Sequence, residues 1–257
     1  MSETPYEIIK SNVEHTDVGR CGLTFTGGRI NDTYGVGLKP HGYEQKRWTE
    51  GDMEYYDDEW GNLWVRMVGR SAKGEIRTAA IEQWSQLDDF TPPNYEHPSV
   101  AEQAREALAA ETDKYKLAHI GGWIFDNARY LRKLEIYLAD MALYPEELKR
   151  MHAIVERVYE RKIHIAGEAG AHGIFIGEDM GTQTGLLFSP DMFREYFKTM
   201  YTRLFSIAHE YGMPVFMHSC GYNWEIIPDL IDAGVNVFQF DQPAVYDMPE
   251  LAKLFKK

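Results

Sequence analysis

The feature that most constrains the fold is an alternation of short apolar segments with longer amphipathic segments, which begins after about residue 95. Strands that are apolar nearly throughout and joined by helices are typical of a parallel sheet covered by helices. Right-handed crossovers curl such a sheet into a barrel. We therefore predict an α/β fold of the (β/α)8 TIM-barrel type, with strands at residues 115–120, 172–177, 214–218 and 235–240.

Residues with capping chemistry predict where several helices begin and end. Ser99 is predicted to cap a helix through Ala101–Thr112, because its hydroxyl can accept a backbone hydrogen bond. Pro145 opens another helix as a first-turn proline. A third helix starts at Ser189-Pro190 and runs to about Tyr211, and Gly212 closes it, since glycine tolerates the left-handed conformation that ends many helices.

The predicted barrel is incomplete at its C-terminus. Only four strands are predicted after residue 95, whereas a (β/α)8 barrel needs eight. The sequence ends in a helix predicted to start at Pro249, with no closing element. A half barrel has two unpaired edges, which favour association. We expect a truncated barrel, an open sheet, or closure by a second copy in a homodimer.

The first part of the chain has a different character, so we predict two domains. Residues 1–95 are rich in glycine and aromatic side chains and have β-ribbon character, with a turn at 57–62 and an alternating strand at 63–68. The acidic run at 57–59 is expected to be a solvated turn. Residues 96–257 form the barrel portion, and the prolines at 92 and 93 mark the connection.

Composition narrows the class of partner. The net charge is −13 and no stretch is rich in lysine and arginine, which argues against nucleic acid or an anionic membrane as a partner. No apolar run approaches the ~18 residues of a membrane span, and the N-terminus lacks the apolar core of a signal peptide. We expect a cytoplasmic protein. Cys21 and Cys220 cannot make a disulfide scaffold, so each is a small buried hydrophobe or a reactive thiol.

The most informative motif is His218-Ser219-Cys220, at the carboxyl end of a predicted strand. Residues two apart in an extended segment project to the same side. Imidazole and thiolate are ligands that zinc prefers, and parallel barrels place their active sites at the carboxyl ends of their strands. The alternative is a histidine and a cysteine that simply pack there. The spacing alone leaves both interpretations open.

Carboxylates follow two neighbouring predicted strands and should reach the same edge as His218. Glu178 and Asp179 lie in a glycine-rich loop, and at least one is expected to bind metal, act as acid or base, or contact substrate. Asp241 follows the last strand and is a ligand, an orienting group or a loop carboxylate. The alternative is that these groups cap loops or remain solvated.

Aromatic residues at positions 55, 56, 60 and 64 cover the barrel floor or shape a substrate pocket, and the sequence leaves both open. No Walker loop, dinucleotide-binding glycine fingerprint, nucleophile elbow or CxxC pair occurs.

Several of these motifs occur together in one known superfamily. The runs 177–181, 187–195, 217–221 and 227–231, with Gln242-Pro243, resemble the uroporphyrinogen decarboxylase superfamily over about residues 95–257. The run at 55–61 is similar to members of its corrinoid-dependent methyltransferase branch. The decarboxylases carry an N-terminal arginine motif that is absent here, where Arg20 and Arg29 are the only arginines of the corresponding stretch. The resemblance therefore favours the methyltransferase branch.

This resemblance implies a zinc enzyme that moves a methyl group from a small methylated substrate, such as a methyl ether, to cobalamin on a separate corrinoid protein. His218 and Cys220 match two zinc ligands. The third, a later cysteine, is expected beyond residue 257, unless Glu178, Asp179 or Asp241 substitutes for it.

The resemblance further implies that Asp179 and Glu178 are the catalytic carboxylates. Gln183, Asp241 and Trp60 are expected to bind substrate. One alternative is a uroporphyrinogen decarboxylase-type lyase of porphyrin biosynthesis, in which Asp179 stabilises a protonated pyrrole. The other is a non-catalytic barrel fragment.

Overall fold

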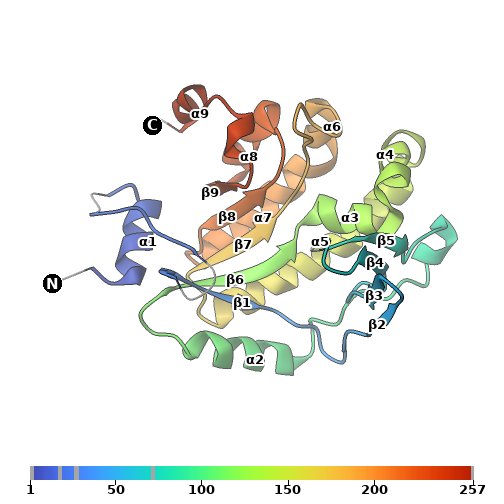
Figure 1. Ribbon diagram of the computed structural model, residues 1–257, viewed down its shortest axis with the longest axis horizontal. Coiled ribbons are helices and arrows are strands. Elements are labelled where there is room, and N and C mark those ends of the chain that lie inside the picture. Colours follow the sequence, from blue (N-terminus) through green and yellow to red (C-terminus); the bar gives the residue numbers. More distant parts are fainter. Residues whose placement is uncertain (1–2, 17–18, 26–28, 71–72, 256–257) are drawn as a thin grey trace.

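The computed structural model describes residues 3–16, 19–25, 29–70 and 73–255 (Figure 1). Within these residues the strands form two sheets, one parallel with five strands and one antiparallel with four. Helices connect the strands of the parallel sheet and pack on it, so the predicted α/β class is confirmed. None of the described helices combines the length and the apolar character that crossing a membrane requires.

The parallel sheet has the strand order β1-β6-β7-β8-β9. Each strand runs parallel to its neighbours, so the carboxyl ends of all five lie at one edge. The four strands expected after residue 95 are confirmed, with ends shifted by a residue or two. Their bounds are β6 Tyr115–Gly122, β7 Gly173–Gly177, β8 Val215–Ser219 and β9 Val235–Phe240.

The fifth strand, β1 (Thr33–Gly37), was not expected from the sequence. It pairs with β6 and contributes the first strand of the sheet from the N-terminal region. Among the described residues β1 and β9 remain the two edges, and the sheet is not closed into a barrel. The fold is thus an open arc of the TIM-barrel type.

A continuous layer of helices covers one face of the sheet, because α2 packs on α5, α5 on α7, and α7 on α8. The opposite face is covered at its amino-terminal end by α1, whose Ile9 packs with Tyr115, Leu117 and Phe216. The bounds are α1 Pro5–Val13, α2 Pro98–Ala109, α5 Pro145–Glu168, α7 Thr199–Glu210 and α8 Ile227–Ala233.

Two helices that follow β6 were not predicted, α3 (Ile124–Arg132) and α4 (Leu134–Leu143). Lys133, with a φ of 64°, separates them. The shorter elements are α6 Pro190–Phe193, the π-helix Arg194–Lys198, α9 Met248–Leu254, and 3-10 turns at Trp84–Leu87, Trp224–Ile226 and Pro243–Val245.

The helix caps were predicted correctly at three positions and wrongly at one. Pro145 occupies the first turn of α5, and Ser189 Oγ accepts from Met192 N at 3.2 Å. Gly212 follows α7 with a φ of 69°. Ser99 is not the cap of α2, because Pro98 already occupies the first turn and His97 Nδ1 accepts from Ser99 N.

The antiparallel sheet has the order β2-β3-β4-β5, with bounds β2 Arg47–Glu50, β3 Met53–Asp57, β4 Leu63–Met67 and β5 Glu75–Thr78. The predicted strand at 63–68 is therefore confirmed. The acidic turn before it is not a solvated one. Asp58 accepts from Trp60 N, Asn62 N and Trp64 Nε1, and Glu59 pairs with Lys162 Nζ at 3.1 Å.

One apolar core joins the two regions of the chain. Trp60 and Ile81 of the first region belong to the same buried cluster as Met151 and Ile174 of the second. Together with the pairing of β1 and β6, this packing makes the two regions share a core. The division at residue 95 stays a prediction.

Candidate functional site

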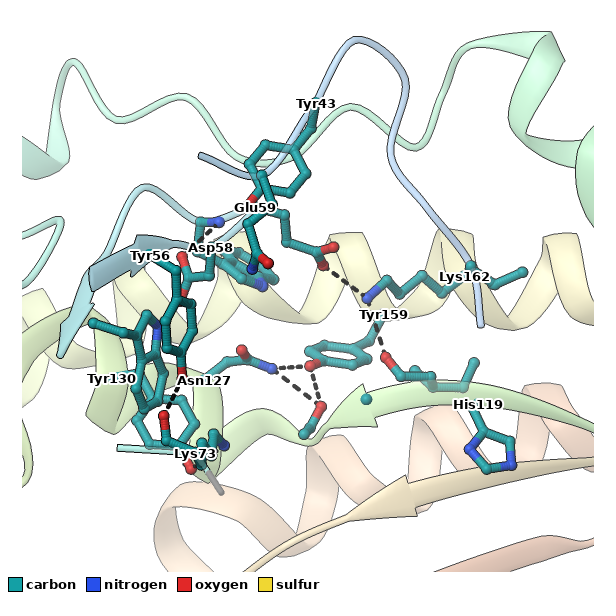
Figure 2. Close-up of a pocket in the computed structure, with 17 residues that line it drawn as sticks. Tyr43, Tyr56, Asp58, Glu59, Lys73, His119, Asn127, Tyr130, Tyr159 and Lys162 are labelled. Carbon is teal, nitrogen blue, oxygen red and sulfur yellow. Dashed lines mark hydrogen bonds and ion pairs between the residues drawn. The ribbon is translucent and has the colours of Figure 1, made fainter. Parts of the chain in front are cut away.

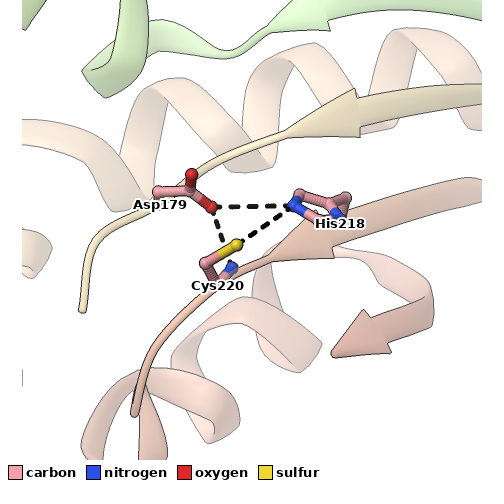
Figure 3. A group of neighbouring side chains, drawn as sticks. All are labelled: Asp179, His218 and Cys220. Atoms are coloured by element: carbon pink, nitrogen blue, oxygen red, sulfur yellow. Dashed lines mark hydrogen bonds and ion pairs between the residues drawn. The ribbon is translucent and has the colours of Figure 1, made fainter. Parts of the chain in front are cut away.

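Asp179, His218 and Cys220 meet at the carboxyl edge of the parallel sheet (Figure 3). Asp179 follows β7, His218 lies near the end of β8, and Cys220 directly follows β8. Their possible ligand atoms all lie within 4.8 Å of one another. Cys220 Sγ is 3.5 Å from His218 Nε2, which is 3.8 Å from Asp179 Oδ1. The structure thus brings together three of the predicted site residues.

Hydrogen bonds between the ends of β7 and β8 hold this triad in place. Cys220 N donates to Asp179 Oδ1 at 2.8 Å, and Glu178 N donates to His218 O at 3.0 Å. Ser219, whose side chain points to the other side of β8, donates from Oγ to Glu178 O at 2.7 Å. Because hydrogen bonds join the ends of β7 and β8, the side chains of Asp179, His218 and Cys220 are already held close together in the absence of a bound ion or substrate.

Gln239 orients the imidazole of His218. Its Oε1 lies 2.5 Å from His218 Nδ1, and β9 places the two residues side by side in register. An amide oxygen can only accept, so Nδ1 carries the proton and Nε2 faces Cys220 and Asp179 with its lone pair. The sequence analysis missed Gln239, although its position two residues before Asp241 puts both on the same side of the last strand.

The donor set fits a zinc ion. One imidazole nitrogen, one thiol sulfur and one carboxylate oxygen are all zinc ligands, and three protein ligands with one open position are typical of catalytic zinc sites. The side chains of His218 and Asp179 are 27% and 35% exposed, so a small molecule can reach them. Burial, followed by the negative charge of Asp179, raises the pKa of the Cys220 thiol to about 11.

Glu178 lies next to the triad in sequence, but its carboxylate points away from it. The side chain is fully buried and accepts from Phe125 N at 2.8 Å, from Asp126 N at 3.3 Å, and from the hydroxyl of Tyr201. Burial, followed by the charge of Asp126, raises the pKa of Glu178 well above its ordinary value. Its contacts anchor the first turn of α3, and a catalytic role for Glu178 stays a prediction.

Gln183 and Asp241 lie at the rim of the site, on exposed loops. Gln183 Nε2 is 3.5 Å from Gln242 Oε1, which also accepts from Gly221 N at 3.1 Å. Asp241 N donates to Ser219 O at 3.2 Å, and its charge contributes to the raised pKa of Cys220. No hydrogen bond between the described residues joins either side chain to the triad. Substrate binding by both remains a prediction.

Trp60 is 4% exposed and lines a pocket of about 430 Å³ between the antiparallel sheet, α5 and the end of β6 (Figure 2). The pocket has aromatic walls and several polar groups, among them Lys73, His119, Asn127 and Lys162. The aromatic residues that line it are Tyr43, Tyr56, Trp60, Trp64, Tyr130 and Tyr159. Trp60 therefore packs in the core and also faces the pocket.

Comparison with known proteins gives one family. Residues 68–256 match the sequence model of the family described as "Uroporphyrinogen decarboxylase (URO-D)". No curated protein matches this chain by sequence.

Among solved structures, a methyltransferase from Methanosarcina mazei is similar in fold, with a TM-score of 0.57 and 16% identity over 76% of this chain. The chain spans 57% of the length of that protein. A protein described as "QR15, an Aldolase" has 15% identity over 60% of this chain and 80% of its own, but its TM-score of 0.26 is too low to carry an argument.

Proposed function

The chain belongs to the uroporphyrinogen decarboxylase (URO-D) family, and we propose that within this family it acts as a zinc-dependent methyltransferase. It would transfer a methyl group from a small methylated substrate, such as a methyl ether, to the cobalamin of a separate corrinoid protein. The fold similarity to a methyltransferase is compatible with this assignment. The observation that carries the proposal is the convergence of Asp179, His218 and Cys220 at the sheet edge where parallel barrels place their active sites.

Asp179, His218 and Cys220 would hold the zinc, and Gln239 would keep the imidazole in the tautomer that binds it. Bound there, the ion would supply Lewis acidity to the substrate atom that loses the methyl group. The aromatic pocket beside the triad would enclose the substrate and reduce its contact with water. Gln183 and Asp241, on the exposed rim, would contact the part of the substrate that faces solvent.

The zinc content of the purified protein tests this proposal. We expect close to one zinc per chain, falling to background in His218→Ala and Cys220→Ser, because each variant removes one of three ligands. Cys21→Ser is the matched control, since Cys21 is an exposed cysteine outside the site. The zinc-loaded protein should also methylate free cobalamin from a methyl ether, and the Cys220→Ser variant should not.

The rival function within the same family is decarboxylation. It requires no metal, so turnover of a porphyrinogen by protein stripped of zinc would contradict the methyltransferase proposal. Equal zinc content in the native protein and in both ligand variants would remove its basis.

A further inference from the structure

Of the two lysines that line the aromatic pocket, only one has a carboxylate in direct contact. Lys162 Nζ is bonded to Glu59 Oε1 and to the carbonyl of Ile120, both at 3.1 Å. Lys73 takes part in none of the ion pairs found among the described residues. Its Nζ lies over two aromatic rings, 5.1 Å from the centre of Trp64 and 4.1 Å from that of Tyr130. Lys73 therefore brings to the pocket a positive charge that no carboxylate contacts directly, and the charges of Asp126, Asp179 and Asp58 act on it from farther away.

The backbone of Lys73 is fastened to the pocket wall, because the hydroxyl of Tyr56 donates to its carbonyl oxygen. Burial lowers the pKa of the Lys73 ammonium. This shift means that the charge has lost part of its hydration. The nearby carboxylates offset part of this cost, and an anionic ligand in contact with the ammonium would offset more of it.

Tyr130 adds a hydrogen-bond donor beside this charge. Its Oη accepts from Lys73 Nζ at 2.6 Å and from Arg129 Nη2 at 3.1 Å. Arg129 is itself paired with Asp126, at 2.5 Å. Because two cationic groups donate to the oxygen of Tyr130, its own hydrogen is directed elsewhere. No acceptor for that hydrogen is found among the described residues.

The remaining walls of the pocket suit a flat ring. Tyr56 and Trp64 are stacked with 6.0 Å between their centres and 3° between their planes, and Trp60 lies over Tyr159. Aromatic walls favour an aromatic ligand through offset or edge-to-face packing. A volume of about 430 Å³ is within the range of small-molecule sites.

The pocket adjoins the triad. Gly121 and Gly122, at the carboxyl end of β6, line it, and this end of the strand lies at the same sheet edge as the triad. The negative charge of Asp179 acts on both Lys73 and Tyr130. A ligand held by these two residues would therefore lie close enough to Asp179, and to a metal bound there, for their charges to act on it.

We propose that Lys73 and Tyr130 form an anion-binding subsite and that the pocket takes a small aromatic carboxylate. The carboxylate accepts from Lys73 Nζ and Tyr130 Oη, and the ring lies between the aromatic walls, with its far substituent directed to the triad. That this ligand is the methyl donor rests on the proposed function, whereas the binding itself does not.

The test compares benzoate with benzamide, which has the same shape and no charge, by calorimetric titration of the purified protein. We expect benzoate to bind about tenfold more tightly, as charge-assisted hydrogen bonds allow. Lys73→Met and Tyr130→Phe should each remove most of this preference, while Lys73→Arg keeps it. Lys149→Met is the control, because Lys149 is an exposed lysine that pairs with Glu146.

Two outcomes would overturn the subsite. One is equal binding of benzoate and benzamide to the native protein. The other is a benzoate preference that survives in Lys73→Met but disappears in Cys220→Ser, since the anion would then bind at the metal. If the purified protein contains no zinc but still prefers benzoate to benzamide, and Lys73→Met removes this preference, the subsite is supported. Only the proposal that its ligand is the methyl donor then loses its basis.

Discussion

At the scale of single residues, the proposed metal site depends on a side chain that is not a ligand. Gln239 accepts from His218 Nδ1 and thereby presents Nε2 to Cys220 and Asp179. Without this acceptor the imidazole can rotate or adopt the other tautomer, and part of the binding energy is then used to restore its orientation.

We therefore predict that Gln239→Leu lowers the zinc affinity about 10- to 100-fold, the usual effect of removing a group that orients a ligand. Gln239→Glu keeps an acceptor for Nδ1 and should bind zinc far better than the leucine variant. Competition with a chromophoric chelator measures both affinities. Gln103→Leu, an exposed glutamine of α2, is the control. Equal affinity in Gln239→Leu and the native protein would show that His218 needs no such support.

The sequence was sufficient to predict that His218 and Cys220 lie together and that Asp179, one of three candidate carboxylates, lies near them, but not to predict the groups that orient or surround them. His218 and Cys220 are two residues apart, so their common direction follows from strand geometry. Gln239, Lys73 and Tyr130 act through partners that are distant in sequence, at separations of 21 and 57 residues for the bonds of Gln239 to His218 and of Lys73 to Tyr130. No local pattern records such pairings.

At the scale of elements, the loops that follow β7 and β8 are locked together. Tyr222 N donates to Thr182 O at 2.6 Å. Gly221 has a φ of 78°, and a Cβ added there would lie 2.2 Å from the carbonyl oxygen of Gly181. The close approach of these two backbones keeps Asp179 beside Cys220, so the site needs glycine at position 221.

Gly221 has both a left-handed backbone conformation and a close contact with the opposing loop. Comparing Gly221→Ala with Gly212→Ala separates the two effects. Gly212 also has a left-handed φ, of 69°, but a Cβ there would meet nothing within 4 Å. We expect Gly212→Ala to cost about 1 kcal/mol through its backbone conformation alone. Gly221→Ala should cost about 2 kcal/mol more, because the loops must move apart. Urea unfolding measures the free energy of unfolding of both variants. Equal losses would mean that the two loops can move apart at no cost, which would contradict the close packing at Gly221.

The strand β1 shows why one element was missed. Apolar patterns identified β6 to β9, but β1 contains two glycines in five residues and has little apolar character. A Cβ at Gly35 would lie 2.5 Å from the ring of His119 on the neighbouring strand, so a larger residue there would have to displace this ring. Its pairing with β6 stabilises β1 as a strand.

At the scale of the whole molecule, the core contains a histidine that must stay uncharged. His152 of α5 is 2% exposed, and its Nε2 lies 2.7 Å from the hydroxyl of Tyr137. Burial lowers the pKa of His152 from 6.5 to about 3. The unfolded chain therefore binds a proton between these pH values that the folded protein does not bind. Stability from this group is present above pH 6.5 and is lost as the pH falls below it.

We predict that lowering the pH from 7.5 to 5 reduces the free energy of unfolding by about 2 kcal/mol through His152 alone. The loss is about 1.4 kcal/mol for each pH unit below the pKa of this histidine in the unfolded chain. Glutamine in His152→Gln keeps a polar partner for Tyr137 but does not titrate. The free energy of unfolding of this variant should therefore fall about 2 kcal/mol less than that of the native protein between pH 7.5 and pH 5. Urea unfolding at several pH values measures the difference. His209→Gln, at an exposed histidine, should resemble the native protein. Identical pH profiles for His152→Gln and the native protein would contradict the buried neutral state.

The barrel-type architecture was predictable because strand and helix alternate regularly, and this pattern is a property of the whole chain after residue 95. The shared core was not, since the sequence suggested two separate regions. Trp60 stacks on Tyr159 of α5, and Glu59 and Tyr95 contact Lys162 of the same helix. Such packing across regions leaves no periodic signal in the sequence.

The central claim is that Asp179, His218 and Cys220 together bind a metal. The most direct test is X-ray absorption at the zinc edge of the zinc-loaded protein. We predict one sulfur at about 2.3 Å and the remaining ligands, nitrogen or oxygen, at about 2.0 to 2.2 Å. The sulfur shell should disappear in Cys220→Ser and persist in Cys21→Ser. A spectrum with no sulfur shell, or one that Cys220→Ser leaves unchanged, would contradict the assignment.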